Sequence, residues 1–215
     1  YNEQQLLLAE EAAKQGLRIL DEAAEPAESA KLRTDLLHNL SLVYKNLGRL
    51  EQALVLAQEK IELCERYAYA YSKGLGQGNL GEIYQSMGEA HWSSALKYYE
   101  EALDILHNSD EWQREAVEIL ASRGSLYHEM KQPNEALESY RQAIAGIEAL
   151  RLKMTGGEGR IGFFSTVVSI YEMAVLLCYE TGRFAEAFEF AERARGRTFL
   201  EMANPEERRP LTLAM

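Results

Sequence analysis

The chain has 215 residues, 47% of them hydrophobic, and its 34 acidic and 23 basic side chains give a formal net charge of −11. This length and hydrophobic content allow one continuous core, while the negative charge argues against nucleic acid or an anionic membrane surface as a partner. The two cysteines, Cys64 and Cys178, are too few for a disulfide-stapled secreted domain, and the simplest compartment is the cytoplasm.

The first predicted element is an amphipathic helix over residues 1 to about 23. Four leucines are expected near one face of it: Leu7, Leu8, Leu17 and Leu20. Pro26 either ends this helix or begins the next one, because proline cannot continue the backbone hydrogen bonding of a helix interior. We expect this helix to be the second half of an incomplete hairpin.

Four later stretches repeat one pattern at a separation of about 40 residues, which predicts a repeat architecture. Each has an aromatic or small residue, a short turn marked by Gly or Pro, and a helix centred on an alanine. The alanines are Ala53, Ala95, Ala136 and Ala187. An aromatic residue facing an alanine lets two antiparallel helices approach closely. The pattern therefore predicts four helical hairpins, over residues 30–67, 70–108, 112–153 and 160–203, each bound being approximate.

The offset between the residue before the turn and the alanine differs in one hairpin. Tyr44 precedes Ala53 by 9 residues, whereas Tyr84 precedes Ala95 by 11. The turn of the second hairpin is therefore predicted to be two residues longer.

These residues resemble the tetratricopeptide repeat family. The best matches to its motif are Leu80, Gly81, Tyr84, Ala95, Tyr99 and Ala102, followed by Gly124, Tyr127, Ala136, Tyr140 and Ala143. The first hairpin has Ser41 for the glycine and Ala57 for the second aromatic, and the last has Val175 and Cys178 for Gly and Tyr. The length of the repeats is similar to that of the kinesin light chain subclass.

The resemblance implies an all-α fold: a right-handed superhelical solenoid of antiparallel helix hairpins, with about nine helices. Residues 1–204 are expected to form this one domain, and residues 205–215 a linker or tail.

The apolar stretch Ile161–Cys178 is the one candidate for a membrane span. Glu172 lies in its middle, serine and threonine residues interrupt it, and its end fits the repeat register. We therefore predict that it is a covered helix of the solenoid.

No pattern indicates chemistry. Glycine-rich stretches from Gly76 and from Gly157 mimic a dinucleotide fingerprint, but neither follows a predicted strand. The four histidines share no ligand spacing, so no metal site is predicted. No nucleophile lies in a recognisable elbow. We expect neither an enzyme nor a cofactor.

Stacked hairpins predict a concave groove lined by the first helix of each pair. The family resemblance implies that this groove holds a peptide or a partner protein. The residues expected to face it are His38, Asn39, Leu42, Lys45, Gln77, Asn79, Glu82, Gln85, Ser125, His128, Glu172 and Tyr179. In the kinesin light chain-like subclass, asparagines equivalent to Asn39 and Asn79 contact the bound chain. The alternative is that these two only join neighbouring helices.

The last predicted helix, from residue 184 to about 203, is more apolar than a terminal repeat requires. Phe190 and Leu200 lie off its apolar stripe. This excess indicates that further polypeptide or a second copy of the chain packs there. The second hypothesis for function is therefore a structural module that self-associates through this end.

The same helix resembles the last repeat of bacterial proteins in which tetratricopeptides precede a CHAT domain, a caspase-like peptidase fold. The matching residues are Ala187, Phe188, Glu189, Glu192, Arg193, Arg195, Arg197 and Leu200. This resemblance implies a protein-interaction scaffold that positions or restrains a C-terminal peptidase domain.

Overall fold

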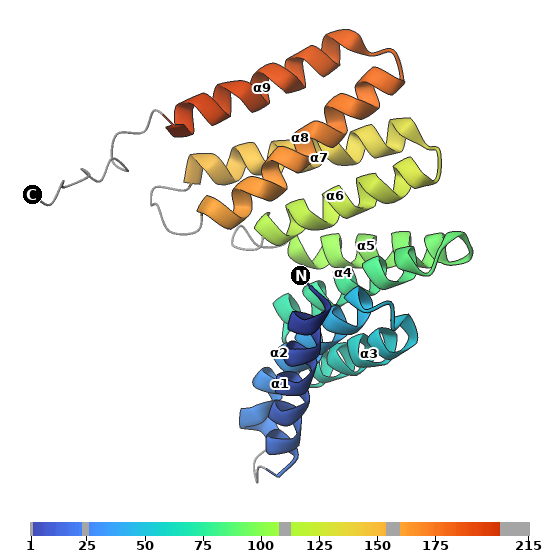
Figure 1. Ribbon diagram of the computed structural model, residues 1–215, viewed down its shortest axis with the longest axis vertical. Coiled ribbons are helices and arrows are strands. Elements are labelled where there is room, and N and C mark those ends of the chain that lie inside the picture. The colour runs from blue at the N-terminus through green and yellow to red at the C-terminus, as the bar shows by residue number, and fades with distance from the viewer. Residues whose placement is uncertain (1, 23–25, 108–112, 154–159, 203–215) are drawn as a thin grey trace, which may run out of the picture. The chain divides into compact units, whose positions relative to one another are not determined.

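The computed structural model describes residues 2–22, 26–107, 113–153 and 160–202 (Figure 1). Within these ranges the chain forms nine α-helices and a short 3₁₀ turn, with no strand, as the all-α prediction requires. The helices are α1 (Glu3–Asp21), α2 (Pro26–Asn46), α3 (Leu50–Arg66), α4 (Ala70–Ser86), α5 (Trp92–Leu106), α6 (Gln113–Glu129), α7 (Pro133–Lys153), α8 (Arg160–Glu180) and α9 (Phe184–Met202), and the 3₁₀ turn is η1 (Glu89–His91).

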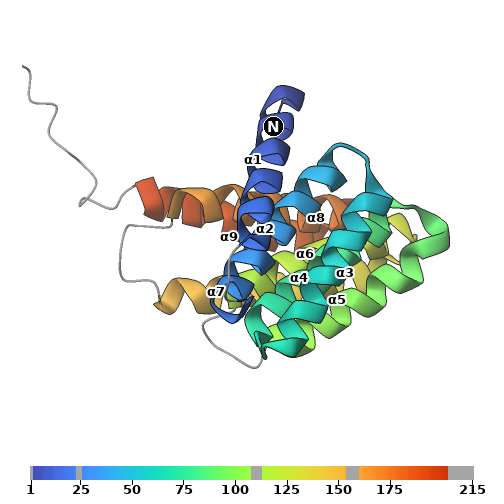
Figure 2. The same ribbon diagram turned by 90° about the horizontal axis from the view of Figure 1, so that it is seen from below.

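The helices group into two compact units, Tyr1–Met154 and Thr155–Met215. In the first unit each helix packs against the next, which gives the hairpins α2–α3, α4–α5 and α6–α7. The first helices α2, α4 and α6 also contact one another in succession, and Figure 2 shows α3 and α5 together on one side of α2 and α4. In the second unit α8 packs against α9. Successive first helices thus form a continuous wall within the first unit.

Three of the hairpin turns use one backbone device. Gly48 and Gly182 have φ of 72° and 71°, and Lys131 takes the same place in the α6–α7 turn with φ of 60°. The amide after this residue donates back into the preceding helix, as from Arg49 N to the Tyr44 carbonyl at 2.9 Å. The α4–α5 turn differs, because Gly88 has φ of 93° and ψ of −173° and η1 follows it. This turn is two residues longer than that of the first hairpin, as predicted.

Size complementarity holds each hairpin together. A Cβ placed on Gly81 would lie 2.5 Å from carbons of the Tyr99 ring, and one on Gly124 would lie 2.9 Å from Tyr140 Cε1. These glycines let a buried tyrosine of the second helix lie directly on the first helix. In the first hairpin the smaller residue Ala57, fully buried on α3, replaces the tyrosine. Because Ala57 is smaller than tyrosine, it leaves room for a side chain at the position of the glycine, where the first hairpin has Ser41.

The buried face of α1 differs from the predicted one. Leu6, Glu10 and Ala13 are buried, whereas Leu7 and Leu8 are 44% and 67% exposed. The prediction that Leu7 and Leu8 lie on the packed face was therefore wrong. The buried residues are spaced by four and three, which keeps their side chains on one side of the helix. One of them is the acidic residue Glu10, so a search for apolar residues alone does not find this face. Glu10 is neutralised by Lys14 Nζ at 2.6 Å and by Arg49 Nη1 at 3.0 Å.

Candidate binding groove

The wall formed by α2, α4 and α6 is hollowed at one end. The hollow has a volume of about 600 Å³. Its lining is polar and comes from four helices: Lys45 on α2, Glu82, Gln85 and Ser86 on α4, Tyr99 on α5, and Ser122, Ser125 and Glu129 on α6. Helices of the repeat framework therefore fix each of these groups in place.

Hydrogen bonds connect the lining residues across the helices. Lys45 forms an ion pair with Glu82, which joins α2 to α4. The Tyr99 hydroxyl donates to Gln85 Oε1 at 2.8 Å, and Gln85 Nε2 donates to Glu129 Oε1 at 2.7 Å. This series runs from α5 through α4 to α6. It orients Gln85, and the Glu129 carboxylate has the capacity to accept from further donors.

Negative charge dominates the electrostatics of this wall. Burial, together with the carboxylates of Glu82 and Glu129, raises the pKa of Tyr99 well above its usual value. Burial also raises the pKa of Glu118, and Glu115 and Glu82 add to this effect against the opposing charge of Arg114. Carboxylates on α4 and α6 therefore act on one another through space.

The structure brings together four of the residues predicted to face the groove. Lys45, Glu82, Gln85 and Ser125 all line the hollow. They occupy two equivalent positions in successive first helices: Lys45 matches Gln85, and Glu82 matches Ser125.

The two asparagines lie elsewhere. Asn39 is exposed on α2 and does not belong to the lining of the hollow. Asn79 is 4% exposed, and its Nδ2 donates to Ser41 Oγ at 2.8 Å. Ser41 Oγ in turn donates to the carbonyl of Ala53 at 2.8 Å. The carboxamide of Asn79 therefore joins α4 to α2 and, through Ser41, to α3.

The remaining predicted residues are spread over the wall and the second unit. Gln77 is buried in α4, while Leu42 and His128 are partly buried and lie outside the lining of the hollow. Burial, and then the charges of Lys60 and Lys45, lowers the pKa of His38 to about 3, so its imidazole is neutral at ordinary pH.

Glu172 and Tyr179 belong to α8 in the second unit and are both exposed. The Tyr179 ring makes an edge contact with Phe184, at a centroid distance of 5.6 Å. Neither residue is among those that line the hollow.

Four lining residues were missed from the sequence. Ser122 occupies the place of Asn39 and Asn79 in the third hairpin, so strict use of the repeat register finds it. Ser86 and Glu129 share a position one residue beyond Gln85 and His128. Tyr99 reaches the hollow from the second helix because Gly81 opens a path for its ring, a contact that sequence spacing alone does not show.

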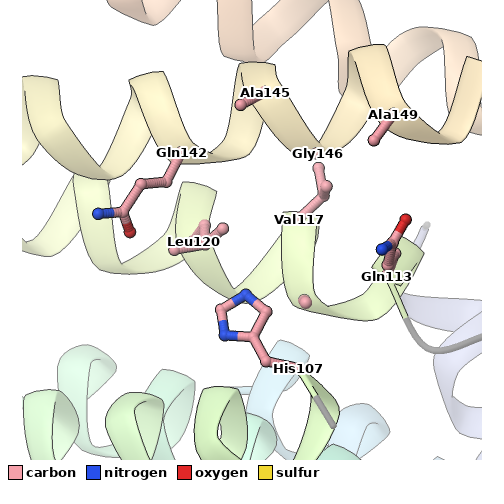
Figure 3. A pocket seen from close by; sticks show the side chains of 9 residues that line it. His107, Gln113, Val117, Leu120, Gln142, Ala145, Gly146 and Ala149 are labelled. Carbon is pink, nitrogen blue, oxygen red and sulfur yellow. The ribbon is translucent and has the colours of Figure 1, made fainter. Parts of the chain in front are cut away.

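A second hollow, of about 340 Å³, lies beside α6 and α7 (Figure 3). Its lining carries no carboxylate, ammonium or guanidinium group and consists of His107, Gln113, Ala116, Val117, Leu120, Gln142, Ala145, Gly146 and Ala149. A Cβ on Gly146 would lie 2.7 Å from Val117 Cγ2, so glycine allows the two helices to approach there. This hollow offers fewer polar contacts to a ligand than the one at Lys45.

The structure also bears on the motifs for other chemistry. Gly76, Gly78 and Gly81 lie within a helix, where they contact neighbouring helices, so this glycine pattern forms no phosphate-binding turn. The pattern that begins at Gly157 is not within the described residues. Across the described ranges, no group of three or more His, Cys, Asp or Glu is arranged to hold a metal ion. In those same ranges, none of the helices combines the length and apolarity that a bilayer crossing needs.

Two family models match the sequence, both described as tetratricopeptide repeat, over residues 34–67 and 75–149. The chain carries tetratricopeptide repeats. The matched ranges contain the Tyr99 and Tyr140 hairpins as well as the first hairpin, in which Ser41 and Ala57 depart from the motif. The prediction of tetratricopeptide repeats is thereby confirmed.

Solved structures share this repeat fold. BtubC (BKLC) from P. vanneervenii has a TM-score of 0.72 and 18% identity, over 98% of this chain and 80% of that one. A Podosopora anserina putative kinesin light chain with nearly identical TPR-like repeats has a TM-score of 0.63 and 18% identity, over 90% and 86% of the two chains. The apo form of RapI has a TM-score of 0.68 and 15% identity, over 88% of this chain and 63% of RapI. No curated protein matches the sequence. At these identities the likeness establishes the solenoid fold alone.

Proposed function

We propose that the tetratricopeptide wall of α2, α4 and α6 binds a segment of a partner protein non-covalently. The observation that carries this proposal is the hollow at Lys45, whose lining offers hydroxyl, carboxamide and carboxylate groups on fixed helices. A peptide main chain presents both donors and acceptors, and Gln85, Ser122 and Ser125 can satisfy either kind. Tetratricopeptide repeats serve generally as protein-interaction modules, and the repeat fold supports the same role for this chain.

Filling the hollow tests the proposal. Peptides selected from a random library against the intact chain should lose at least tenfold in affinity when Ser125→Tyr places a ring in the hollow. The matched control is Ser93→Tyr on the exposed surface of α5. Circular dichroism melts of both variants show whether the fold survives. Equal binding to the Ser125→Tyr variant and the wild type contradicts the proposal.

We also propose that Asn39 contacts the partner, and a separate variant tests this. Its side chain is exposed, so Asn39→Ala changes little of the folded core. If Asn39 bonds the partner, the selected peptides bind this variant more weakly at unchanged stability. Asn79 is unsuitable for the same test, because its carboxamide is part of the helix packing.

Self-association through the second unit is a second candidate function. Its supporting observation is an exposed apolar set on α8 and α9: Val168, Leu176, Tyr179, Phe184 and Phe188. Exposed aromatic residues in contact with one another are typical of surfaces that bind a partner. Sedimentation equilibrium of the wild type and of the double variant Phe184→Gln and Phe188→Gln tests this candidate. A strict monomer at high micromolar concentration contradicts it.

We also propose a context for the module, from the resemblance of the α9 sequence to the repeat that precedes a CHAT peptidase. The supporting residues are the charged run that contains Glu189, Glu192, Arg193 and Arg195. In that context the repeats restrain or position a peptidase, and the chemistry belongs to the other domain. Inspection of the parent reading frame for a histidine and a cysteine in caspase-like order tests this context directly.

A cytoplasmic location is the compartment we infer. Cys64 and Cys178 are both buried and are not joined in a disulfide, which suits a reducing environment. Fractionation of the source cells, with detection by an antibody against the chain, tests this inference.

A further inference from the structure

The charges of the wall indicate what kind of segment it receives. One face of α6 carries a stripe of five residues spaced by three and four: Glu115, Glu118, Ser122, Ser125 and Glu129. This spacing places all five side chains on one side of the helix. Glutamates lie toward both ends of the stripe, and two serines lie between them. The α6 stripe therefore has negative charges that are separated by a section with short side chains.

Few cations on the neighbouring helices oppose these acids. Lys45 is committed to Glu82, and both side chains are largely covered. Arg114 approaches Glu118 at 3.9 Å, a distance at which two half-exposed groups attract only weakly. Glu115 accepts a hydrogen bond from the Tyr71 hydroxyl at 2.9 Å, which adds no positive charge.

Glu129 is the least compensated of these acids. It accepts a hydrogen bond from the neutral amide of Gln85, and no lysine or arginine of the described residues forms an ion pair with it. Among the described residues, four carboxylates of this set, on Glu82, Glu115, Glu118 and Glu129, therefore have two cations in ion pairs with them, Lys45 and Arg114, which leaves an excess of negative charge. The mutual effect of Glu82, Glu115 and Glu118 described above is the expected result of this excess.

We infer that this groove selects an extended, basic peptide segment whose two cationic side chains lie four residues apart, and so on one side of the extended chain; this inference rests on the proposed function. Glu118 and Glu129 are eleven residues apart on α6, which corresponds to about 16 Å along a helix. Four residues of an extended chain cover about 13 Å, and the two long cationic side chains can span the remaining distance of about 3 Å. Ser122 and Ser125 leave room for its main chain between the two acids. An acidic segment is repelled by the same charges.

Designed peptides test this inference on the intact chain. Three fluorescein-labelled peptides share one Gly/Ser/Thr background and carry, at two positions four residues apart, Arg, Gln or Glu. A fourth peptide has its two Arg residues adjacent. In fluorescence anisotropy we expect the spaced Arg peptide to bind at least tenfold more tightly than the Gln peptide and more tightly than the adjacent-Arg peptide, with no binding of the Glu peptide.

Charge-matched variants separate groove binding from general attraction to an acidic protein. The double variant Glu118→Gln and Glu129→Gln should weaken the spaced Arg peptide by about tenfold. The control, Glu59→Gln and Glu62→Gln on the exposed surface of α3, changes the net charge equally and should leave binding unchanged. Equal loss in both variants, or equal binding of the two Arg peptides, overturns the inference.

The peptides selected in the preceding test distinguish the two proposals. If neutral or acidic peptides are selected and Ser125→Tyr blocks them, the wall binds segments and the basic specificity is wrong. If no designed or selected peptide is sensitive to Ser125→Tyr, both the specificity and the binding role of the groove are wrong.

Discussion

Two junctions in the first unit use equivalent positions with different chemistry. Where α6 packs against the α4–α5 hairpin, Gly78, Ala102 and Ile119 meet. A Cβ on Gly78 would lie 2.2 Å from Ile119 Cδ1 and 4.0 Å from Ala102 Cβ. Where α4 packs against the α2–α3 hairpin, the same three repeat positions hold His38, Lys60 and Gly76. A Cβ on Gly76 would lie 3.6 Å from Lys60 Cδ.

The difference shows that the repeat conserves volume more strictly than polarity. At the second junction, between α6 and the α4–α5 hairpin, the large residue Ile119 on α6 faces the small residue Ala102. At the first junction, between α4 and the α2–α3 hairpin, the sizes are exchanged, because Gly76 on α4 faces Lys60. The helices can therefore pack in either case. The exchange also puts an ammonium group, on a side chain that is 1% exposed, where the motif has an alanine. We therefore expect the first junction to be the weaker and the more sensitive to pH.

Removing the buried charge should have the largest effect. Burial lowers the pKa of Lys60 from 10.5 to about 8, so protonated Lys60 opposes folding at neutral pH. The unfolded chain binds the proton more tightly, and stability should therefore rise between pH 8 and pH 10.5, by on the order of 3 kcal/mol in all. Lys60→Met should remove this rise and stabilise the protein at pH 7 by about 2 kcal/mol. Urea denaturation at pH 7 and at about pH 9.5 measures both effects.

Lys31→Met, on the exposed surface of α2, is the matched control and should change neither value appreciably. The upper pH stays below 10, the ordinary pKa of tyrosine. Burial raises the pKa of Tyr71 and of Tyr140 to about 12 in the folded chain, so above about pH 10 their ionisation favours the unfolded chain. A Lys60→Met variant that is less stable at pH 7, or that keeps the wild-type pH dependence, contradicts the comparison of the junctions.

The contact inside each hairpin gives the next largest effect. Gly81→Ala puts a Cβ 2.5 Å from the ring of the fully buried Tyr99, and a ring in a packed core cannot rotate away. We expect a loss of about 2 kcal/mol, even after the gain in helix propensity from alanine. Gly78→Ala meets only the end of the Ile119 side chain, which can change rotamer, and should cost about 1 kcal/mol or less.

Denaturation midpoints compare the two alanine variants in one experiment. The ranking is the test, since both variants gain the same helix propensity. If Gly78→Ala proves the more damaging of the two, the rigid contact between Tyr99 and Gly81 is not what limits this hairpin.

The two asparagines provide a smaller contrast between the first and second hairpins. Asn79→Ala removes the donor to Ser41 at 2.8 Å in a buried setting and should cost about 1 kcal/mol. Asn39→Ala, at the equivalent but exposed position on α2, should cost less than about 0.5 kcal/mol. Equal losses in thermal denaturation would mean that the repeat position itself, and not the contact with Ser41, sets the requirement for asparagine.

Sequence reasoning predicted the hairpins because their signals are local. The alanines, glycines and aromatic residues recur at fixed offsets, and the structure packs Tyr99 on Gly81 and Tyr140 on Gly124. The register also brought four of the predicted residues to the hollow, led by Lys45 and Glu82. These successes rest on helix periodicity, which a single sequence displays.

The remainder depended on contacts between helices that sequence does not display. The burial of Asn79 follows from Ser41 one hairpin earlier, and Lys60 was overlooked because a charged residue was not expected at an alanine position. On α1 the apolar pair Leu7 and Leu8 suggested the wrong face, since the buried stripe includes Glu10, whose charge Lys14 and Arg49 neutralise. Partners far along the chain decide all three cases.

The turns extend the comparison to the third hairpin and give the smallest expected effect. The first hairpin places Gly48 at the left-handed position, with φ of 72°, whereas the third has Lys131 there with φ of 60°. A residue with a Cβ is disfavoured in this conformation by about 1 kcal/mol, and glycine returns part of that through its freedom in the unfolded chain. Lys131→Gly should therefore stabilise the protein by about 0.5 kcal/mol. The reverse change, Gly48→Lys, should destabilise it by a similar amount, and urea midpoints of the two variants measure both. If Lys131→Gly lowers the midpoint, the Lys131 side chain contributes a contact that outweighs the backbone preference.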